Sequence, residues 1–475
     1  MDERRYDVVV IGGGSTGENV AGRVTAAGLT AVVVEAELVG GECSYWACMP
    51  SKALLRPVQA LTAARRVAGA REAVTGVLDT TAVFARRDAF TKHWDDASQV
   101  KWLGDHHIDL VRGHARITGE RRVRVAGASV DLVAARAVAI CTGSAAAIPD
   151  IPGLAAATPW TPREATSTRV VPRRLAILGG GVVGCEMATA WRALGTTEVT
   201  LLQRAGGLLD DNEPFAGEAV RAGLEAAGVR VLTNVSTVRV DRRAEGAVVL
   251  ALDGHAPLVA DELLVAAGRR AQTDDLGLET IGLRPGAWLD VDDDLRVRGI
   301  AGGWLYAAGD VNHRALLTHM GKYQARICGD VIVARAQGTL GNDTPAPWSR
   351  WAATADRAAV PQVVFTEPEV AAVGLTEAQA RARGVTVRVV DYDIGKVAGA
   401  ALHADDYAGR ARMVVDESRR VLVGVTLVGP SVGELIHAAT VAVVGEVPID
   451  RLWHAVPSYP TISELWLRLL EAYGL

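Results

Sequence analysis

Cysteine is scarce in this chain, with five residues among 475: Cys43, Cys48, Cys141, Cys185 and Cys328. That number is too small for the dense disulfide framework of a secreted scaffold. Runs of eighteen or more uncharged apolar residues are absent, which argues against a membrane span, and the first residues lack the apolar segment of a signal peptide. A net charge of −5 gives no reason to expect nucleic acid or an anionic membrane as a partner. We therefore expect a cytoplasmic protein that binds neither.

The length of the chain exceeds what one hydrophobic core organises, and it predicts three or four domains. Apolar residues make up 49% of the chain and charged residues 22%, which is typical of globular proteins. This composition leaves no room for a large disordered region.

A nucleotide-binding pattern occupies the first forty residues. A β-branched run over residues 6–11 predicts a buried parallel strand. It is followed by Gly12-x-Gly14-x-x-Gly17, a helical stretch to about residue 27, and a second strand that ends at Glu35. Such glycines let the backbone approach a pyrophosphate at a helix N-terminus, and the acid can hold ribose hydroxyls. The pattern predicts a dinucleotide site; a glycine turn without a ligand is the alternative.

The same pattern recurs from residue 174, with Gly179-x-Gly181-x-x-Gly184 as its glycine loop. Two such units predict two dinucleotide sites. The second strand of this repeat ends in Gln203, followed by Arg204, where an acid would select NAD. Glutamine does not repel a 2′-phosphate and arginine can pair with one, so we expect NADPH, with NADH use also open. The alternative for Arg204 is a solvated surface residue.

Cys43 and Cys48 stand five residues apart, directly after Gly40-Gly41. Ideal helical geometry would separate them by about 7.5 Å, beyond the ~7 Å Cα limit for a disulfide. A bridge therefore requires one cysteine at the irregular start of a helix, which the two glycines favour. A helix N-terminus would also lower the thiolate pKa, as a redox thiol needs. The alternative is a pair of unlinked core cysteines.

Residues 40–52 match the pattern GG-x-C-x4-C-x-P-[ST]-K at every fixed position. In this run the chain resembles the pyridine nucleotide-disulfide oxidoreductases, the family of dihydrolipoamide dehydrogenase, glutathione reductase and mercuric reductase. The resemblance extends from Tyr6 to Glu464. It implies an α/β fold with two Rossmann-like domains, for FAD and NAD(P), and a C-terminal α+β dimerisation domain. We expect FAD-binding segments at 1–152 and 271–340, an NAD(P)-binding domain at 153–270, and the dimerisation domain at 347–475.

The resemblance also implies the residues that hold each cofactor. Lys52 would lie beside the flavin and pair with Glu186, and His319 would lie near the flavin, with helix packing as an equal alternative for the histidine. The expected FAD contacts are Gly12, Gly14, Gly17, Glu35, Thr142, Gly143 and Asp310. The expected nicotinamide contacts are Gly179, Gly181, Gly184, Gln203, Arg204 and Gly268.

The C-terminal motif departs from the family. Disulfide reductases of this family read His-Pro-Thr-x-Ser-Glu, whereas this chain has Tyr459 at the histidine position and Glu464 as the orienting acid. An unperturbed tyrosine has a pKa of ~10, against ~6.5 for histidine, so it is a poor base near pH 7. Loss of general acid–base catalysis should slow dithiol exchange by ~10²–10⁴-fold. His454 could serve as a displaced base or be a surface residue.

These residues predict a homodimeric flavoenzyme whose active site is completed by the partner chain. Electrons would pass from NAD(P)H through FAD to the Cys43–Cys48 disulfide, with Cys48 contacting the flavin and Cys43 as the interchange thiol. The acceptor would be a small molecule: a disulfide, quinone, metal ion or other electrophile. The alternatives are a dihydrolipoamide dehydrogenase or glutathione-type reductase, and an FAD-holding redox sensor with little turnover. The chain has no cysteine after Cys328, so it lacks the C-terminal cysteine pair of mercuric reductases.

Overall fold

The computed structural model describes residues 2–475. Its contacts divide the chain into two compact units, each assembled from three separate stretches. The first unit consists of Met1–Met49, Asp88–Ala145 and Arg269–Arg357. The second unit consists of Pro50–Arg87, Ala146–Gly268 and Ala358–Leu475.

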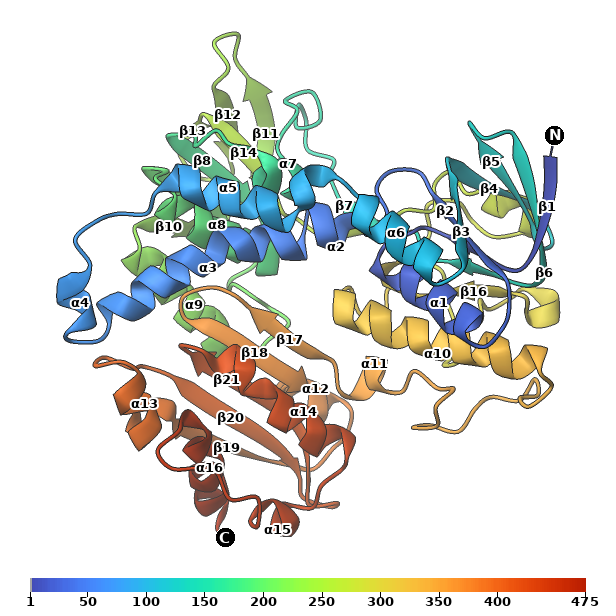
Figure 1. Cartoon of the computed structure of the whole chain (residues 1–475). Helices are drawn as coiled ribbons and strands as arrows, with labels where there is room; N and C mark the ends of the chain where they lie inside the picture. The colour runs from blue at the N-terminus through green and yellow to red at the C-terminus, as the bar shows by residue number, and fades with distance from the viewer. Residues whose placement is uncertain (1) are drawn as a thin grey trace. The chain divides into compact units, whose positions relative to one another are not determined.

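A mostly parallel sheet forms the centre of the first unit (Figure 1). Its strands lie in the order β3-β2-β1-β6-β5-β4, and β16 pairs with β6 in parallel. β4 and β5 extend the sheet with antiparallel pairs. The strands are β1 (Asp2–Ile11), β2 (Ala31–Glu35), β3 (Ile108–Arg112), β4 (His114–Gly119), β5 (Arg122–Ala126), β6 (Val130–Ile140) and β16 (Leu305–Ala307). The short strands β7 (Ser144–Ala146) and β15 (Arg269–Ala271) pair separately.

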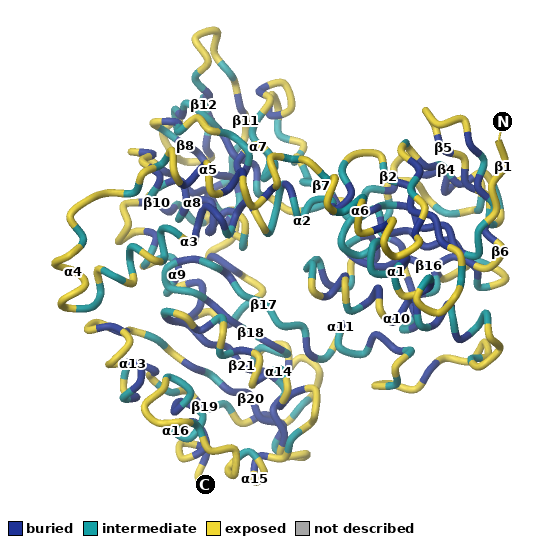
Figure 2. The backbone as a smooth tube through the Cα atoms, viewed as in Figure 1, coloured by how far each residue is buried: buried dark blue, intermediate teal, exposed yellow. Residues whose placement is uncertain are grey.

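Continuous apolar runs explain why the central strands are buried on both faces. Val8, Val9 and Val10 of β1 are fully inaccessible to solvent, as are Val32 and Val33 of β2. β-Branched side chains favour this environment. Figure 2 shows the burial concentrated along these strands. Helix α1 packs against α10. The helices are α1 (Ser15–Ala26), α2 (Gly41–Tyr45), α6 (Ala97–Asp105), α10 (Thr318–Ala336) and α11 (Ala355–Ala358), with 3₁₀ turns η1 (Lys92–Trp94), η2 (Leu278–Ile281), η3 (Ala301–Gly303) and η4 (Asp310–Asn312).

The second unit contains three sheets. A four-stranded parallel sheet has the order β10-β9-β8-β14, a three-stranded antiparallel sheet has the order β11-β12-β13, and a five-stranded antiparallel sheet has the order β17-β18-β21-β20-β19. The first two comprise β8 (Arg174–Leu178), β9 (Glu198–Leu202), β10 (Val229–Leu232), β11 (Thr237–Arg242), β12 (Val248–Leu252), β13 (Leu258–Ala260) and β14 (Glu262–Val265). The third comprises β17 (Pro361–Val364), β18 (Glu369–Gly374), β19 (Val387–Asp393), β20 (Arg410–Asp416) and β21 (Val421–Gly429).

Helices flank these sheets, and α3 and α5 each cross from one unit into the other along the sequence. The apolar side chains of α8 and α9 are buried in one cluster with β8 and β9, around Trp191. The helices are α3 (Cys48–Arg65), α4 (Ala70–Ala73), α5 (Thr80–Phe90), α7 (Pro162–Ser167), α8 (Val182–Ala193), α9 (Pro214–Ala226), α12 (Glu377–Ala382), α13 (Ala398–His403), α14 (Ile436–Val444), α15 (Ile449–Leu452) and α16 (Leu465–Tyr473), with 3₁₀ turns η5 (Ile394–Lys396), η6 (Val432–Glu434) and η7 (Ile462–Glu464).

The strand orders repeat a single topology. β3-β2-β1-β6 and β10-β9-β8-β14 both have the 3-2-1-4 order of a dinucleotide-binding fold. Together with the antiparallel sheet and helices of the last third, this confirms the predicted fold class. Within residues 2–475, the structure has no helix that is both long and apolar enough to cross a bilayer.

Candidate active site

The first glycine loop connects β1 to α1, and its three glycines have different surroundings. A Cβ on Gly12 would lie 2.5 Å from the carbonyl oxygen of Cys141, and one on Gly17 would lie 1.9 Å from that of Gly12. Both positions therefore exclude any side chain. A Cβ on Gly14 would approach only the Cα of Gly41, at 3.8 Å. Gly14 caps the N-terminus of α1, so an open space lies where a pyrophosphate can approach helix N–H groups.

Glu35 closes this loop from the end of β2. One carboxylate oxygen accepts a hydrogen bond from the Gly13 N–H at 2.6 Å, and the other accepts one from the Glu37 N–H at 2.7 Å. Burial raises the pKa of Glu35, and the two backbone donors act in the opposite direction. The strand end thus brings an acid to the glycine loop, as ribose binding requires.

Asp310 lies in a polar group that also contains Ser144 and Arg269. The Ser144 hydroxyl donates to an Asp310 carboxylate oxygen at 2.5 Å, and the Arg269 Nε donates to the same hydroxyl oxygen at 2.5 Å. Beside them, the buried Thr142 hydroxyl has no hydrogen-bond partner within residues 2–475, and a Cβ on Gly143 would find no atom within 4 Å. An orphaned hydroxyl beside open space fits a polar ligand. Together with the first glycine loop, these residues fit FAD.

A buried hydrogen-bond network holds the loop that contains Asp310. The side-chain oxygen of Gln324 accepts from the Gly309 N–H at 2.7 Å and from the Asn312 amide at 2.8 Å. The Gln324 amide nitrogen donates to Asp356 at 3.0 Å. Burial raises the pKa of Asp356 to about 6, partly offset by Arg314.

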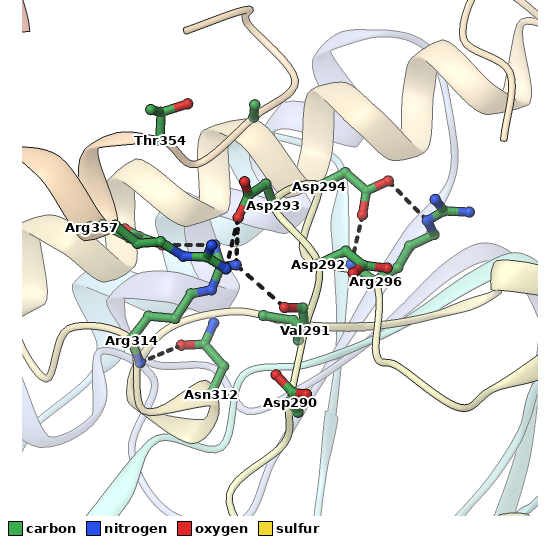
Figure 3. Close-up of polar contacts among 12 residues, drawn as sticks. Asp290, Val291, Asp292, Asp293, Asp294, Arg296, Asn312, Arg314, Thr354 and Arg357 are labelled. Carbon is green, nitrogen blue, oxygen red and sulfur yellow. Dashed lines mark hydrogen bonds and ion pairs between the residues drawn. The ribbon is translucent and has the colours of Figure 1, made fainter. Parts of the chain in front are cut away.

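The guanidinium of Arg314 lies 3.5 Å from Asp356 and so extends this network. Figure 3 shows the contacts of Arg314 with Asp293 and Asn312. The Arg314 guanidinium forms an ion pair with Asp293 at 2.6 Å, and Arg357 approaches the same carboxylate at 3.1 Å. Next to it, the fully buried Asp294 pairs with Arg296 and with Arg335. The buried carboxylate of Asp294 is thus paired, as burial of charge requires.

The second glycine loop repeats the geometry of the first. A Cβ on Gly179 would lie 2.3 Å from the Ala266 carbonyl oxygen, and one on Gly184 would lie 1.9 Å from that of Gly179. A Cβ on Gly181 or on Gly268 would find no atom within 4 Å. The crowded first and third glycines and the open second glycine fit a second dinucleotide.

The polar residue at the end of the second strand also repeats the first site. The Gln203 side-chain oxygen accepts from the Gly180 N–H at 3.0 Å, as Glu35 accepts from Gly13. Arg204 is exposed and forms no ion pair within residues 2–475.

The two cysteines lie on consecutive helices, Cys43 within α2 and Cys48 at the first residue of α3. Both are thiols in the structure. A hydrogen bond with Cys48 and burial raise the pKa of the Cys43 thiol, while Thr318 and the charge of Lys322 act in the opposite direction. The Cys48 sulfur lies 3.2 Å from the Thr318 hydroxyl.

The segment between the cysteines is held by Trp94, whose indole N–H donates to the Tyr45 carbonyl at 3.1 Å. His319 follows Thr318 on α10 and is exposed.

Lys52 and Glu186 form an ion pair within the second unit, although 134 residues separate them. The Lys52 ammonium lies 2.7 Å from one oxygen of Glu186, and the other oxygen accepts from the Phe365 N–H at 3.0 Å. The ammonium also lies 4.9 Å from the centre of the Phe365 ring. Glu186 is 3% exposed. Lys52 neutralises the charge of this buried carboxylate, and the Phe365 N–H fixes its orientation.

The C-terminal motif divides into an exposed and a buried part. Tyr459 is 77% exposed, and its hydroxyl makes no hydrogen bond to any residue in the range 2–475. Glu464 is buried, and one of its oxygens accepts from Arg468 at 2.6 Å. The other oxygen is buried without a partner in the described part of the chain. His454 is exposed.

Several residues of these sites escaped sequence reasoning: Ser144, Asp210, Arg269, Thr318, Gln324 and Asp356. Ser144 and Thr318 adjoin residues that were singled out, and this adjacency was the only signal for them. Asp210 lies in a loop, and its contact with Gln203 has no sequence signature.

Comparison with known proteins gives a consistent result. Residues 6–338 match the family described as "Pyridine nucleotide-disulphide oxidoreductase", and residues 360–469 match "Pyridine nucleotide-disulphide oxidoreductase, dimerisation domain". The chain is 31% identical to a dihydrolipoyl dehydrogenase of Thermus scotoductus, over 99% of this chain and 97% of that one. It is 28% identical to a mercuric reductase of Staphylococcus aureus, over 97% and 81%.

Among solved structures, the chain resembles the Cu(II) complex of the HOCl-induced flavoprotein disulfide reductase RclA from Escherichia coli. The TM-score is 0.82 at 25% identity, over 98% of this chain and 99% of that chain.

Proposed function

Because the chain belongs to the pyridine nucleotide-disulphide oxidoreductases, we propose that it passes electrons from NAD(P)H through FAD to Cys43 and Cys48, and on to an electrophilic acceptor. The family uses FAD and a nicotinamide dinucleotide, and bound FAD would supply the two-electron carrier between nicotinamide and sulfur. The observation that carries the proposal is the repeated glycine loop, open at Gly14 and at Gly181, in a chain that also holds a dithiol.

The dithiol chemistry falls to Cys48 and Cys43 in different roles. By the family pattern Cys48 contacts the flavin and Cys43 attacks the acceptor. The Thr318 hydroxyl, 3.2 Å from the Cys48 sulfur, can donate to a thiolate there. The start of α3 at Cys48 adds backbone N–H groups that favour negative charge. These contacts support Cys48 as the sulfur that carries charge when the pair is reduced.

Lys52 and Glu186 have a positioning role in this proposal. The family pattern assigns the lysine to the flavin ring, where a fixed positive charge favours electron density on the ring nitrogens. The buried carboxylate of Glu186, held by the Phe365 N–H, restrains the lysine side chain. The short Lys52–Glu186 ion pair and the Phe365 N–H that holds Glu186 support this role, because they restrict the lysine to one position.

Among possible acceptors we propose a thiophilic metal ion ahead of a quinone or a disulfide. Tyr459 replaces the base that dithiol exchange needs, whereas two thiolates reduce a metal ion without a proton acceptor for the substrate. In that step the two thiolates form the Cys43–Cys48 disulfide, and the two electrons they release reduce two Cu(II) to two Cu(I). The mercuric reductases and the Cu(II)-bound RclA among the relatives support this class.

A second candidate is a dihydrolipoamide dehydrogenase, which the Thermus scotoductus relative favours. In this case the exposed His454 would have to replace the missing base. The two candidates differ in their dependence on that histidine.

We also propose a homodimer in which Tyr459 and Glu464 of one protomer complete the site of the other. A matched dimerisation domain supports the assembly. The exposed Tyr459 hydroxyl and the buried Glu464 oxygen lack hydrogen-bond partners within residues 2–475, as groups that act on a second protomer would.

Anaerobic reduction of the purified protein tests the proposal. Addition of NADH or NADPH should give a long-wavelength thiolate-to-flavin band that Cys43→Ser retains and Cys48→Ser abolishes. Reoxidation by Cu(II) should then be faster than by lipoamide, and unaffected by His454→Ala. Bleaching without the band would refute the dithiol relay. A yellow protein that no acceptor turns over would favour a redox sensor instead.

A further inference from the structure

Gln203 occupies the position of the acid that usually distinguishes NADH from NADPH, but it does not leave the site without an acid. Its side-chain oxygen accepts the Gly180 N–H at 3.0 Å, so the amide orientation is fixed. Its amide nitrogen then donates to Asp210 at 3.1 Å. The glutamine therefore connects the glycine loop to a carboxylate seven residues further along the chain.

The loop that bears Asp210 is folded back onto the glycine loop. The Leu209 N–H donates to the Gly180 carbonyl at 3.0 Å, and a Cβ on Gly180 would lie 2.5 Å from a methyl group of Leu208. Leu208 and Leu209 are both buried. Two buried leucines and a backbone hydrogen bond thus fix the loop, while Asp210 itself stays exposed at its surface.

The charges of this segment oppose a 2′-phosphate. Residues 203–212 contain one cation, Arg204, and two acids, Asp210 and Asp211, which gives a net charge of −1. Arg204 and Asp211 are exposed. Of these three charged residues, only Asp210 forms a side-chain hydrogen bond with Gln203 within residues 2–475. A carboxylate fixed there repels a phosphate dianion and can accept a hydrogen bond from a ribose 2′-hydroxyl.

We propose that Asp210, positioned by Gln203, is the residue that determines nucleotide specificity, and that it makes the second glycine loop prefer NADH over NADPH. The inference rests on the proposed use of this loop for the nicotinamide nucleotide. This inference is opposite to the preference for NADPH expected from Arg204. That expectation is based on the sequence, which does not show that Gln203 is hydrogen-bonded to Asp210. The competing determinants are therefore one fixed carboxylate and one exposed guanidinium.

Calorimetric titration of the FAD-loaded protein distinguishes the effect of Asp210 from that of Arg204 and does not depend on enzymatic turnover. The ligands are adenosine 5′-diphosphoribose and the same compound with a 2′-phosphate. The wild-type protein should bind the unphosphorylated ligand at least about tenfold more tightly, as expected for a hydrogen bond to a charged group. Asp210→Asn should reduce this ratio about tenfold. Asp211→Asn removes the same charge from the next, untethered residue and should change the ratio less than about twofold.

Three outcomes would overturn the inference. Tighter binding of the 2′-phosphorylated ligand, lost in Arg204→Ala, would assign specificity to the arginine. Equal effects of Asp210→Asn and Asp211→Asn would reduce the role of Asp210 to general charge. Binding of neither ligand would refute the nicotinamide role of this loop and with it the proposed function. A circular dichroism spectrum identical to that of the wild type would show that Asp210→Asn is folded. Asp210→Glu, which keeps the charge, should restore the wild-type ratio.

Discussion

Gly181 and Gly184 lie three residues apart in one loop, but substitution by alanine should have opposite consequences. At Gly184 the new Cβ would lie 1.9 Å from the carbonyl oxygen of Gly179. That carbonyl is part of the backbone, so no side-chain rotation relieves the clash. At Gly181 the new Cβ would meet no atom within 4 Å, and the backbone angles of −79° and −172° suit alanine.

The magnitudes follow from these surroundings. Overpacking typically costs ~1–3 kcal/mol, and a backbone contact this short belongs at the upper end, even after the ~1 kcal/mol that alanine gains over glycine in a helix. We therefore expect Gly184→Ala to lower the free energy of unfolding by about 2 kcal/mol or more. Gly181→Ala should change it by less than about 1 kcal/mol. Its methyl group should instead fill the space for the pyrophosphate and weaken nucleotide binding at least about tenfold.

Urea denaturation followed by circular dichroism measures the first quantity, and calorimetric titration with adenosine 5′-diphosphoribose measures the second. Gly14→Ala and Gly17→Ala provide the matched pair in the first loop. The new Cβ would lie 3.8 Å from the Cα of Gly41 in the first variant and 1.9 Å from the carbonyl oxygen of Gly12 in the second. We expect Gly14→Ala to lose FAD and Gly17→Ala to lose stability. Unchanged nucleotide affinity in Gly181→Ala, or wild-type stability in Gly184→Ala, would contradict the assignment of the open glycine to the ligand.

Three further predictions concern other parts of the molecule. Tyr459→His should raise lipoamide turnover at least about tenfold through a restored base, in a steady-state assay where Tyr459→Phe should not. Thr318→Val should move the pH titration of the long-wavelength band to higher pH, because the Thr318 hydroxyl lies 3.2 Å from the Cys48 sulfur and can donate a hydrogen bond to a thiolate there. Burial raises the pKa of Asp356 to about 6, so this residue stabilises the fold below pH ~4 and the contribution is lost as the pH rises to about 6. Asp356→Asn should remove up to about 3 kcal/mol of that pH dependence in urea denaturation.

Each of these predictions has its own contradicting result. Equal lipoamide rates for the histidine and phenylalanine variants would exclude position 459 from proton transfer. A Thr318→Val titration that coincides with the wild type would remove the hydroxyl from thiolate stabilisation. Parallel pH profiles of the wild type and Asp356→Asn would mean that Asp356 does not titrate between pH 4 and 6 in the folded state.

The conformation of the two glycine loops could be predicted because its physical requirements are local. A strand, three glycines and a helix start specify the turn at Gly12 and at Gly179, whose φ angles of +101° and +112° suit glycine alone. The Lys52–Glu186 pair spans 134 residues, and only the resemblance to a family indicated it. Periodicity and propensity carry no information on such distant partners.

The hydrogen-bond partners around the sites could not be predicted, because they depend on how loops fold. Ser144 meets Arg269 only because β7 pairs with β15. Asp210 reaches Gln203 because Leu209 adopts a φ of +53°, a conformation that leucine rarely favours. The side-chain amide of Gln324 donates a hydrogen bond to Asp356, which lies 32 residues further along the chain. In each case the contact is set by tertiary packing, which a single sequence does not reveal.

The pairing of β16 with β6 has a consequence for synthesis of the protein. The second half of β6, up to Ile140, gains its neighbour only when Leu305–Ala307 has emerged from the ribosome. At about 5–20 residues per second, some 165 intervening residues take roughly ten to thirty seconds. Throughout that time an apolar strand edge that can pair with another nascent chain stays uncovered. The first unit therefore cannot complete its folding in order of synthesis, and its yield in a cell should depend on chaperones and on the rate of translation.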